Sequence, residues 1–182
     1  MIKIIFFIFL ILFSTNSYSE ENLINSLKEG GKLIFIRHAL APGGGDPDNF
    51  KLNDCSTQRN LNKEGIKQSQ KIGFFFKENQ IPIDKVLSSE WCRCKDTAKY
   101  AFKNFKTFDA LNSFYSLKFQ KNKNKQIKNL KNYIIQWNGK ENLVFVTHYV
   151  VILEMLNYAP SSGEIVIADK NLNVIGSLKT NN

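Results

Sequence analysis

The stretch KLIFIRHALAPGGGD, residues 32–46, joins an apolar run, an Arg-His pair and a glycine-rich loop. Residues 32–36 are apolar and β-prone, which predicts a short buried strand. The long segment that follows, residues 37–60, contains three consecutive glycines and two prolines. A loop of this length without regular structure is unusual in a compact domain and is usually functional. The stretch therefore predicts a strand that delivers Arg37 and His38 to a functional loop.

Apolar segments of strand length alternate with helical patterns along the rest of the chain. Strands are predicted at residues 83–89 and 142–148, and helices at residues 61–80, 90–105 and 124–137. Asn62 and Ser89 are the expected N-caps of the first two helices. Residues 149–159 fit a helix or a strand by composition, and we favour a helix. Residues 164–178 fit a β-hairpin that turns near Lys170-Asn171.

The order of these elements is β-α-β-α-α-β-α-β-β, without internal repeats. Alternation of short apolar strands with helices is typical of an α/β fold with helices on both faces of one sheet. We therefore predict a three-layer α/β/α sandwich with one mostly parallel central sheet. The length of 182 residues suits one such domain.

The N-terminus has the pattern of an export signal. Lys3 precedes the apolar run Ile4–Phe13, and small or polar residues lead to Ser19. This apolar run is too short to cross a bilayer, which takes roughly 20 residues. We predict a signal peptide over residues 1–19 and a single mature domain over residues 20–182, periplasmic or secreted and without stable membrane insertion after cleavage. An uncleaved membrane anchor is the alternative.

The chain is basic, with 25 Lys and Arg against 16 Asp and Glu and a formal net charge of +9. Much of the excess lies in residues 118–133, KFQKNKNKQIKNLKNY. This run fits either a solvated helix face or a basic patch that favours anionic partners. No nucleic-acid-binding motif accompanies it, and we expect no nucleic-acid partner.

The three cysteines are Cys55, Cys92 and Cys94. In an oxidising compartment a disulfide is expected, and Cys55 would pair with either Cys92 or Cys94. One thiol would remain. The absence of a C-x₂-C spacing argues against a zinc site.

Polar residues with catalytic potential follow three of the predicted strands. Arg37 and His38 follow residues 32–36, and His148 follows residues 142–147. Arg93 lies on the first turn of the helix after residues 85–87. These are the only two histidines of the chain. Because sites in open α/β sheets form beyond the carboxyl ends of the strands, these side chains are expected to converge.

Four segments, IRHALAP, RNLNKEGIKQSQ, LSSEWCRCKDTA and LVFVTH, are similar in order and spacing to motifs of one family. Together they resemble the histidine phosphatase superfamily, which includes phosphoglycerate mutases and small bacterial phosphatases. The second segment resembles the Arg-x-Leu-Thr-x-x-Gly-x-x-Gln pattern of that family. The resemblance extends from about residue 32 to residue 167.

The resemblance implies a role for each of the matched residues. His38 would be the nucleophile that forms a phosphohistidine, and Arg37, Arg93 and His148 would surround the phosphoryl group. Arg59 would contact phosphate or substrate.

The chemistry of these residue types agrees with those roles. A neutral imidazole is a competent nucleophile near pH 7, and guanidiniums offer paired N–H donors to phosphoryl oxygens. The arginines make a metal unnecessary, and we expect no cofactor. Backbone N–H groups around Gly44 in the glycine run could approach an anion, although the glycines could equally form a flexible turn.

The sequence departs from the family at the position of the proton donor. Ala39 replaces the glycine that usually follows the nucleophile, and Tyr149 replaces the aspartate that follows the second histidine in some members. The glutamate that serves mutase-like members as general acid has no counterpart. Asp46 and Asp54 are our candidates for the general acid, and Glu90 and Glu164 are weaker ones.

The sequence thus predicts a metal-independent phosphomonoester hydrolase that works through a phosphohistidine at His38. Its substrate would be a small phosphorylated molecule, such as a cell-envelope sugar phosphate. One alternative is a non-catalytic protein of the same fold that binds a phosphorylated ligand. Another is a zinc site formed by His38, His148 and a cysteine.

Overall fold

The computed structural model describes residues 20–179, and the predicted signal peptide lies outside the described residues. The helices are α1 (Glu20–Lys28), α2 (Lys63–Glu78), α3 (Cys92–Phe102), α4 (Leu117–Gln120), α5 (Lys123–Gln136) and α6 (Tyr149–Leu156). The strands are β1 (Leu33–Arg37), β2 (Ile83–Ser88), β3 (Lys106–Thr107), β4 (Asn142–Thr147), β5 (Ile165–Ala168) and β6 (Val174–Leu178). Short 3₁₀ turns lie at Cys55–Thr57 and Asp109–Leu111. None of the helices within residues 20–179 is long and apolar enough to cross a membrane.

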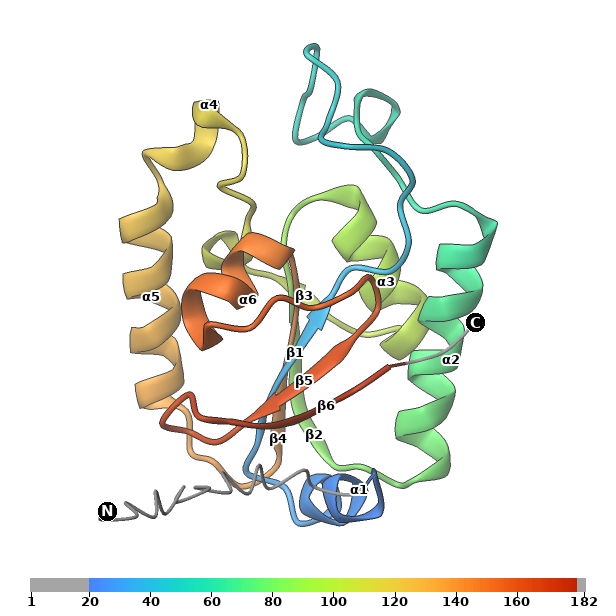
Figure 1. The fold of residues 1–182 in the computed structure, drawn as a ribbon, viewed down its shortest axis with the longest axis vertical. Helices are drawn as coiled ribbons and strands as arrows, with labels where there is room; N and C mark the ends of the chain where they lie inside the picture. Colours follow the sequence, from blue (N-terminus) through green and yellow to red (C-terminus); the bar gives the residue numbers. More distant parts are fainter. Residues whose placement is uncertain (1–19, 180–182) are drawn as a thin grey trace, which may run out of the picture.

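The strands form one six-stranded sheet in the order β3-β2-β4-β1-β5-β6. The first four run parallel to one another, whereas β5 is antiparallel to both β1 and β6. Helices lie between successive parallel strands along the chain, and β5 and β6 are joined by a hairpin (Figure 1). The predicted mostly parallel sheet and the C-terminal hairpin are therefore confirmed.

Helices cover both faces of the sheet. The side chains of the central strands point alternately to the two faces, and each face packs in its own apolar core with helices. Leu33 and Phe35 of β1 pack in a core with α5 and α6, on one side in Figure 1. Ile34 and Ile36 pack in a core with α1, α2 and α3 on the other side. Since the side-chain period of a strand is two, a strand segment buried on both faces is apolar throughout, as residues 33–36 of β1 are. The predicted three-layer α/β/α sandwich is confirmed.

The structure adds three elements that the sequence pattern did not predict, namely α1, β3 and α4. The predicted N-cap Asn62 is confirmed, since its side chain accepts a hydrogen bond from Gly65 N. The predicted N-cap Ser89 is wrong. The N-cap of α3 is Trp91, which makes no side-chain capping bond. The hydroxyl of Ser89 is committed instead to Asn112 and His148.

Parallel pairing brings the carboxyl ends of β1 and β4 to the same edge of the sheet. Arg37 pairs with Thr147, so His38 and His148 both lie one residue beyond the paired strands. The backbone N–H of His38 donates to Thr147 O at 2.9 Å, which continues the ladder. On the other side of β4, Ser88 of β2 pairs with Val146, and Arg93 follows on the first turn of α3. The topology therefore gathers both histidines and two arginines at one edge.

Candidate active site

A pocket of about 830 Å³ opens at this edge of the sheet. Seven of the residues that the sequence singled out line it: Arg37, His38, Gly44, Asp46, Arg59, Arg93 and His148. Its rim includes residues of the glycine-rich loop and of the segment before α4. Asp54 does not line the pocket. Its carboxylate accepts hydrogen bonds from the backbone N–H and the hydroxyl of Ser56, at 3.0 and 2.6 Å.

The imidazole of His38 is only 3% exposed and is oriented by the backbone. Its Nδ1 lies 2.9 Å from Ala39 O, and because a carbonyl only accepts, Nδ1 carries the hydrogen. The lone pair of the neutral ring is then on Nε2. Burial lowers the pKa of His38 well below 6.5, and the positive charge of Arg93 lowers it further. The ring is thus neutral at neutral pH, with its nucleophilic atom defined by a backbone contact.

Asp46 and Arg93 form a two-pronged ion pair inside the pocket. The carboxylate oxygens of Asp46 lie 2.6 and 3.2 Å from Nη1 and Nη2 of Arg93. Asp46 also accepts hydrogen bonds from the backbone N–H of Arg59 at 3.1 Å and from the indole N–H of Trp91 at 3.0 Å. Burial alone would raise the pKa of Asp46, but the hydrogen bond and charge of Arg93 outweigh it and hold this pKa below 3.8.

Positive charge exceeds negative charge in the pocket. Four cationic side chains line it (Arg37, Arg59, Arg93 and Lys118) against two carboxylates (Asp46 and Asp48), an excess of two charges. The buried Nε–H groups of the three arginines have no hydrogen-bond partner within residues 20–179. Arg37 is otherwise held by Pro160 O at 2.9 Å and lies over the ring of Tyr149 at 5.7 Å. Such a pocket suits a doubly charged anion, whose oxygens accept hydrogen bonds from guanidiniums.

The second histidine, His148, is oriented by a chain of hydrogen bonds. The amide of Asn112 is oriented by Glu90, so its Oδ1 accepts from the hydroxyl of Ser89 at 3.0 Å. Since that hydroxyl has a single hydrogen, it accepts from His148 Nε2 at 2.9 Å. Nδ1 of His148 then has the lone pair and lies 3.5 Å from Arg93 Nη2.

The two imidazoles lie close together, with ring centroids 5.6 Å apart. Burial, and next the charge of Arg93, lowers the pKa of His148 well below 6.5. His148 is therefore neutral in the free protein rather than a further cation.

A disulfide links the loop after β1 to α3. Cys55 and Cys92 are bonded, with Cα atoms 5.7 Å apart, which resolves the two pairings that the sequence left open. Next to it, Gln58 accepts a hydrogen bond from Cys92 N at 2.9 Å. The remaining thiol, Cys94, is buried, and burial raises its pKa to about 12. Cys94 is thus a protonated thiol beside His148, at 3.5 Å from its Nε2.

The N-terminal end of α2 holds the start of the loop that follows β1. A Cβ on Gly65 would lie 2.0 Å from Leu40 O, so only glycine permits this approach of backbone to helix. Three residues on, Gln68 accepts from Leu40 N at 3.0 Å and donates to Ser162 O at 2.8 Å. The glycine and the glutamine of the segment at residues 59–68 therefore position the loop rather than contact the pocket's centre.

Two weaker acid candidates have structural partners outside the pocket lining. Glu90 accepts from the amide of Asn112 at 2.6 Å. Glu164 accepts from the hydroxyl of Tyr158 at 2.6 Å and from Ser161 N at 2.7 Å. Within residues 20–179, no group of three His, Cys, Asp or Glu side chains is arranged to hold a metal ion.

Trp91 is the site residue that the sequence left unassigned. It is 3% exposed, lines the pocket and donates its indole N–H to Asp46. Its ring also lies edge-on to His148, with centroids 5.4 Å apart. An aromatic residue directly before the first turn of a helix was the only signal for it, and that signal does not distinguish a site residue from a core residue.

Comparison with known proteins gives similarity in structure but not in sequence. A scan against protein-family models finds no match, and a search of curated proteins finds no relative. Among solved structures, SixA from Agrobacterium tumefaciens is similar with a TM-score of 0.56 and 17% identity, over 81% of this chain and 97% of that chain. The protein histidine phosphatase SixA complexed with tungstate is similar with a TM-score of 0.54 and 14% identity, over 82% of this chain and 97% of that chain.

A third similar structure is a phosphoglycerate mutase from Thermus thermophilus, with a TM-score of 0.52 and 15% identity over 81% of this chain and 98% of that chain. At these identities the likeness concerns the fold. It agrees with the resemblance that the four sequence motifs indicated. The chain has the fold of the histidine phosphatase superfamily.

Proposed function

We propose that the protein is a phosphomonoester hydrolase that needs no metal and works through a phosphohistidine at His38. The observation that carries this proposal is a buried neutral imidazole, with its lone pair on Nε2, in a pocket with two excess positive charges. A neutral imidazole can attack phosphorus, and guanidiniums stabilise the charge on the equatorial oxygens of the transferring group. The tungstate complex of a structure with the same fold supports an oxyanion as the ligand.

In the first step of the proposed reaction, Nε2 of His38 forms a bond to phosphorus while the ester P–O bond breaks. Arg37, Arg59 and Arg93 hold the phosphoryl oxygens. The leaving oxygen takes a proton from an acid. In the second step water attacks phosphorus, gives a proton back to that acid and displaces His38, so phosphate leaves and the imidazole is neutral again.

We propose Asp46 as that acid, because among the candidate carboxylates it lines the pocket and contacts Arg93. In the free protein Arg93 keeps Asp46 ionised. A phosphate dianion that binds the fork of Arg93 replaces this partner and adds a negative charge beside the carboxylate. Both changes raise the pKa of Asp46, which favours its protonation only when substrate is bound.

The first test uses the purified protein without its first 19 residues and p-nitrophenyl phosphate in the presence of EDTA. We expect hydrolysis that the chelator does not affect and that vanadate inhibits. If the protein is inert from pH 4 to pH 9 but still binds phosphate or vanadate, the non-catalytic alternative holds and the proposal is wrong.

A second test separates the role of Asp46 from that of the other pocket residues. Asp46→Asn should reduce kcat/KM for glycerol phosphate by about 10²–10³-fold, within the range of general acid catalysis. It should reduce kcat/KM for p-nitrophenyl phosphate by less than about tenfold, because a stable phenolate leaves without a proton. In the wild type, kcat/KM for glycerol phosphate should decline as pH rises toward neutrality, since Arg93 holds the pKa of Asp46 below 3.8.

The matched control is Asp54→Asn, which alters the other loop candidate. Asn can still accept the hydrogen bonds from Ser56, and we expect both substrates to be hydrolysed as in the wild type. Equal losses on both substrates for Asp46→Asn would mean that Asp46 positions Arg93 and does not donate the proton.

We propose further that the mature protein acts outside the cytoplasm, in the periplasm or after secretion. The disulfide Cys55–Cys92 supports an oxidising compartment, and the signal pattern of residues 1–19 supports export. The substrate would then be a small phosphorylated molecule of that compartment, such as a cell-envelope sugar phosphate.

A further inference from the structure

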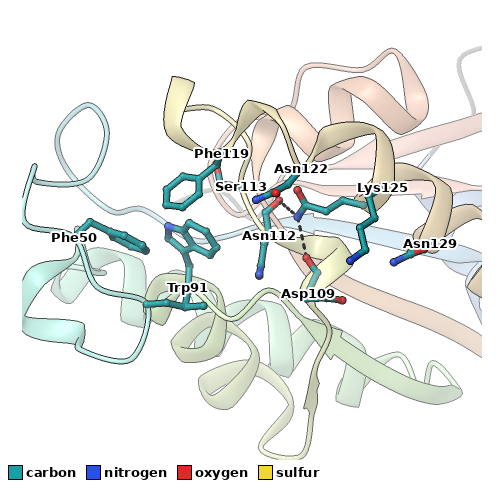
Figure 2. A pocket seen from close by; sticks show the side chains of 11 residues that line it. Phe50, Trp91, Asp109, Asn112, Ser113, Phe119, Asn122, Lys125 and Asn129 are labelled. Atoms are coloured by element: carbon teal, nitrogen blue, oxygen red, sulfur yellow. Dashed lines mark hydrogen bonds between the residues drawn. The ribbon is translucent and has the colours of Figure 1, made fainter.

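A second cavity, of about 250 Å³, lies beside the catalytic pocket. The two share four lining residues: Phe50, Trp91, Ser113 and Phe119. Figure 2 shows three aromatic side chains at one end of this cavity and polar side chains of the α5 region at the other. The mechanism proposed above uses neither the far end of this cavity nor its polar residues.

The aromatic end, here called the aromatic wall, is where the cavity adjoins the catalytic pocket, because its three rings line both. Phe50 stacks on Trp91 with centroids 5.1 Å apart, and Phe119 meets both rings edge-on, at 5.6 and 5.4 Å. The same indole donates to Asp46, so the wall is anchored to the candidate acid. The faces of aromatic rings carry partial negative charge and attract the weakly positive C–H groups of an aliphatic ring.

The polar end comes from one helical face. Asn122, Lys125, Gln126 and Asn129 follow the i, i+3, i+4, i+7 spacing and all line the cavity. The lining contains one acidic residue, Asp109, and one basic residue, Lys125, so its formal charges sum to zero. This lining therefore differs from the cationic pocket next to it and does not favour an anion.

Gln126 is an unsatisfied group in the cavity wall. The residue is 7% exposed, and its Nε2 donates to Asp109 O at 2.9 Å and to Asn112 O at 3.0 Å. Both amide hydrogens are thus committed, which defines the amide orientation. Oε1 has no hydrogen-bond partner within the part of the chain that the structure describes. A buried polar atom without a partner is uncommon in native proteins.

We propose that this second cavity binds a neutral polyhydroxylated ring of the substrate, with its C–H face against the aromatic wall and its hydroxyls on the α5 residues. The proposal rests on the phosphatase function only in that the ring belongs to a phosphorylated substrate. Hydroxyls both donate and accept, which matches a lining of amides, one lysine and one carboxylate. Pockets with apolar walls and a few placed polar groups are typical of small-molecule sites.

The kinetic test compares glucose 6-phosphate with glycerol phosphate, since both have an alkyl leaving group. The wild type should have the lower KM for glucose 6-phosphate. The double variant Lys125→Met/Asn129→Leu should raise that KM by about tenfold or more, the effect of one or two hydrogen bonds, with kcat unchanged. Its hydrolysis of p-nitrophenyl phosphate should be unchanged. Equal KM values for the two substrates in the wild type would overturn the proposal.

Lys128→Met is the matched control, because this exposed lysine also lies on α5 but lines neither cavity. We expect no change in any KM. A KM increase as large as in the double variant would indicate a general loss of positive charge and would also overturn the proposal.

A binding experiment tests the ring site independently of the phosphatase function, because it needs no hydrolysis. Methyl glucoside, which has no phosphate, should shift the NMR signals of the Trp91 indole N–H and the Gln126 side-chain amide in the wild type but not in the double variant. If catalysis is absent and these shifts appear, the phosphatase proposal is wrong and the ring site stands. If the shifts are absent in an inactive protein, both proposals are wrong.

Discussion

His38→Ala is expected to reduce phosphatase activity by roughly 10⁴-fold or more, as the loss of a nucleophile commonly does. The reason is that the hydrogen bond from His38 Nδ1 to Ala39 O keeps the lone pair on Nε2, the atom that attacks phosphorus in the proposed mechanism. Brief incubation with ³²P-labelled substrate and a quench in alkaline detergent should leave a label on wild-type protein. The label should be acid-labile and base-stable, as an N–P bond is, and absent from His38→Ala.

The control for this experiment is Cys94→Ala, which removes the thiol nearest to the site. Because burial raises the pKa of Cys94 to about 12, the sulfur is protonated and unreactive at neutral pH. We expect Cys94→Ala to retain both the label and most of the activity. Label that persists in His38→Ala and disappears in Cys94→Ala would assign the covalent step to the cysteine and contradict the mechanism.

Arg93→Met is expected to weaken both catalysis and stability. Loss of one guanidinium donor to the transferring group commonly reduces the rate by about 10²–10³-fold. The variant also leaves the Asp46 carboxylate, 17% exposed, without its ionic partner. Removal of one member of a largely buried ion pair costs about 3 kcal/mol of the free energy of unfolding, measurable by urea denaturation.

The double variant Arg93→Met/Asp46→Leu separates these two losses. With both charges replaced by apolar side chains, no carboxylate remains unpaired, and most of the lost stability should return. Activity should not return, since the guanidinium and the acid are both absent. If the double variant is as unstable as Arg93→Met, the ion pair is not the cause of the stability loss.

Much of the fold could be predicted from the sequence because it depends on local patterns. The uniformly apolar segments of β1 and β4 indicate strands buried on both faces, and the spacing of Ile72 and Phe76 indicates the buried side of α2. Two of the three missed elements are short and exposed: β3 has two exposed residues, and α4 has no buried residue. Their conformation depends on neighbours rather than on periodicity.

The candidate site was predicted in outline for a related reason. Side chains that directly follow parallel strands must meet at one edge of the sheet, so the positions of His38 and His148 in the chain were sufficient. The wrong N-cap shows the limit of this inference. Ser89 has the right residue type for a cap, but its hydroxyl bonds Asn112 and His148, which are distant in the sequence.

The sequence by itself determined the α/β sandwich, the edge at which the site forms and the residues that follow the strands there, because these depend on periodicity and on chain order. Only the tertiary structure decided how Asp46 pairs with Arg93, which cysteine Cys55 bonds and that Gln126 lines a second cavity. The physical reason is the same in each case. A hydrogen bond, an ion pair or a disulfide depends on a distance of a few ångströms between residues far apart in the chain, and the fold alone sets that distance.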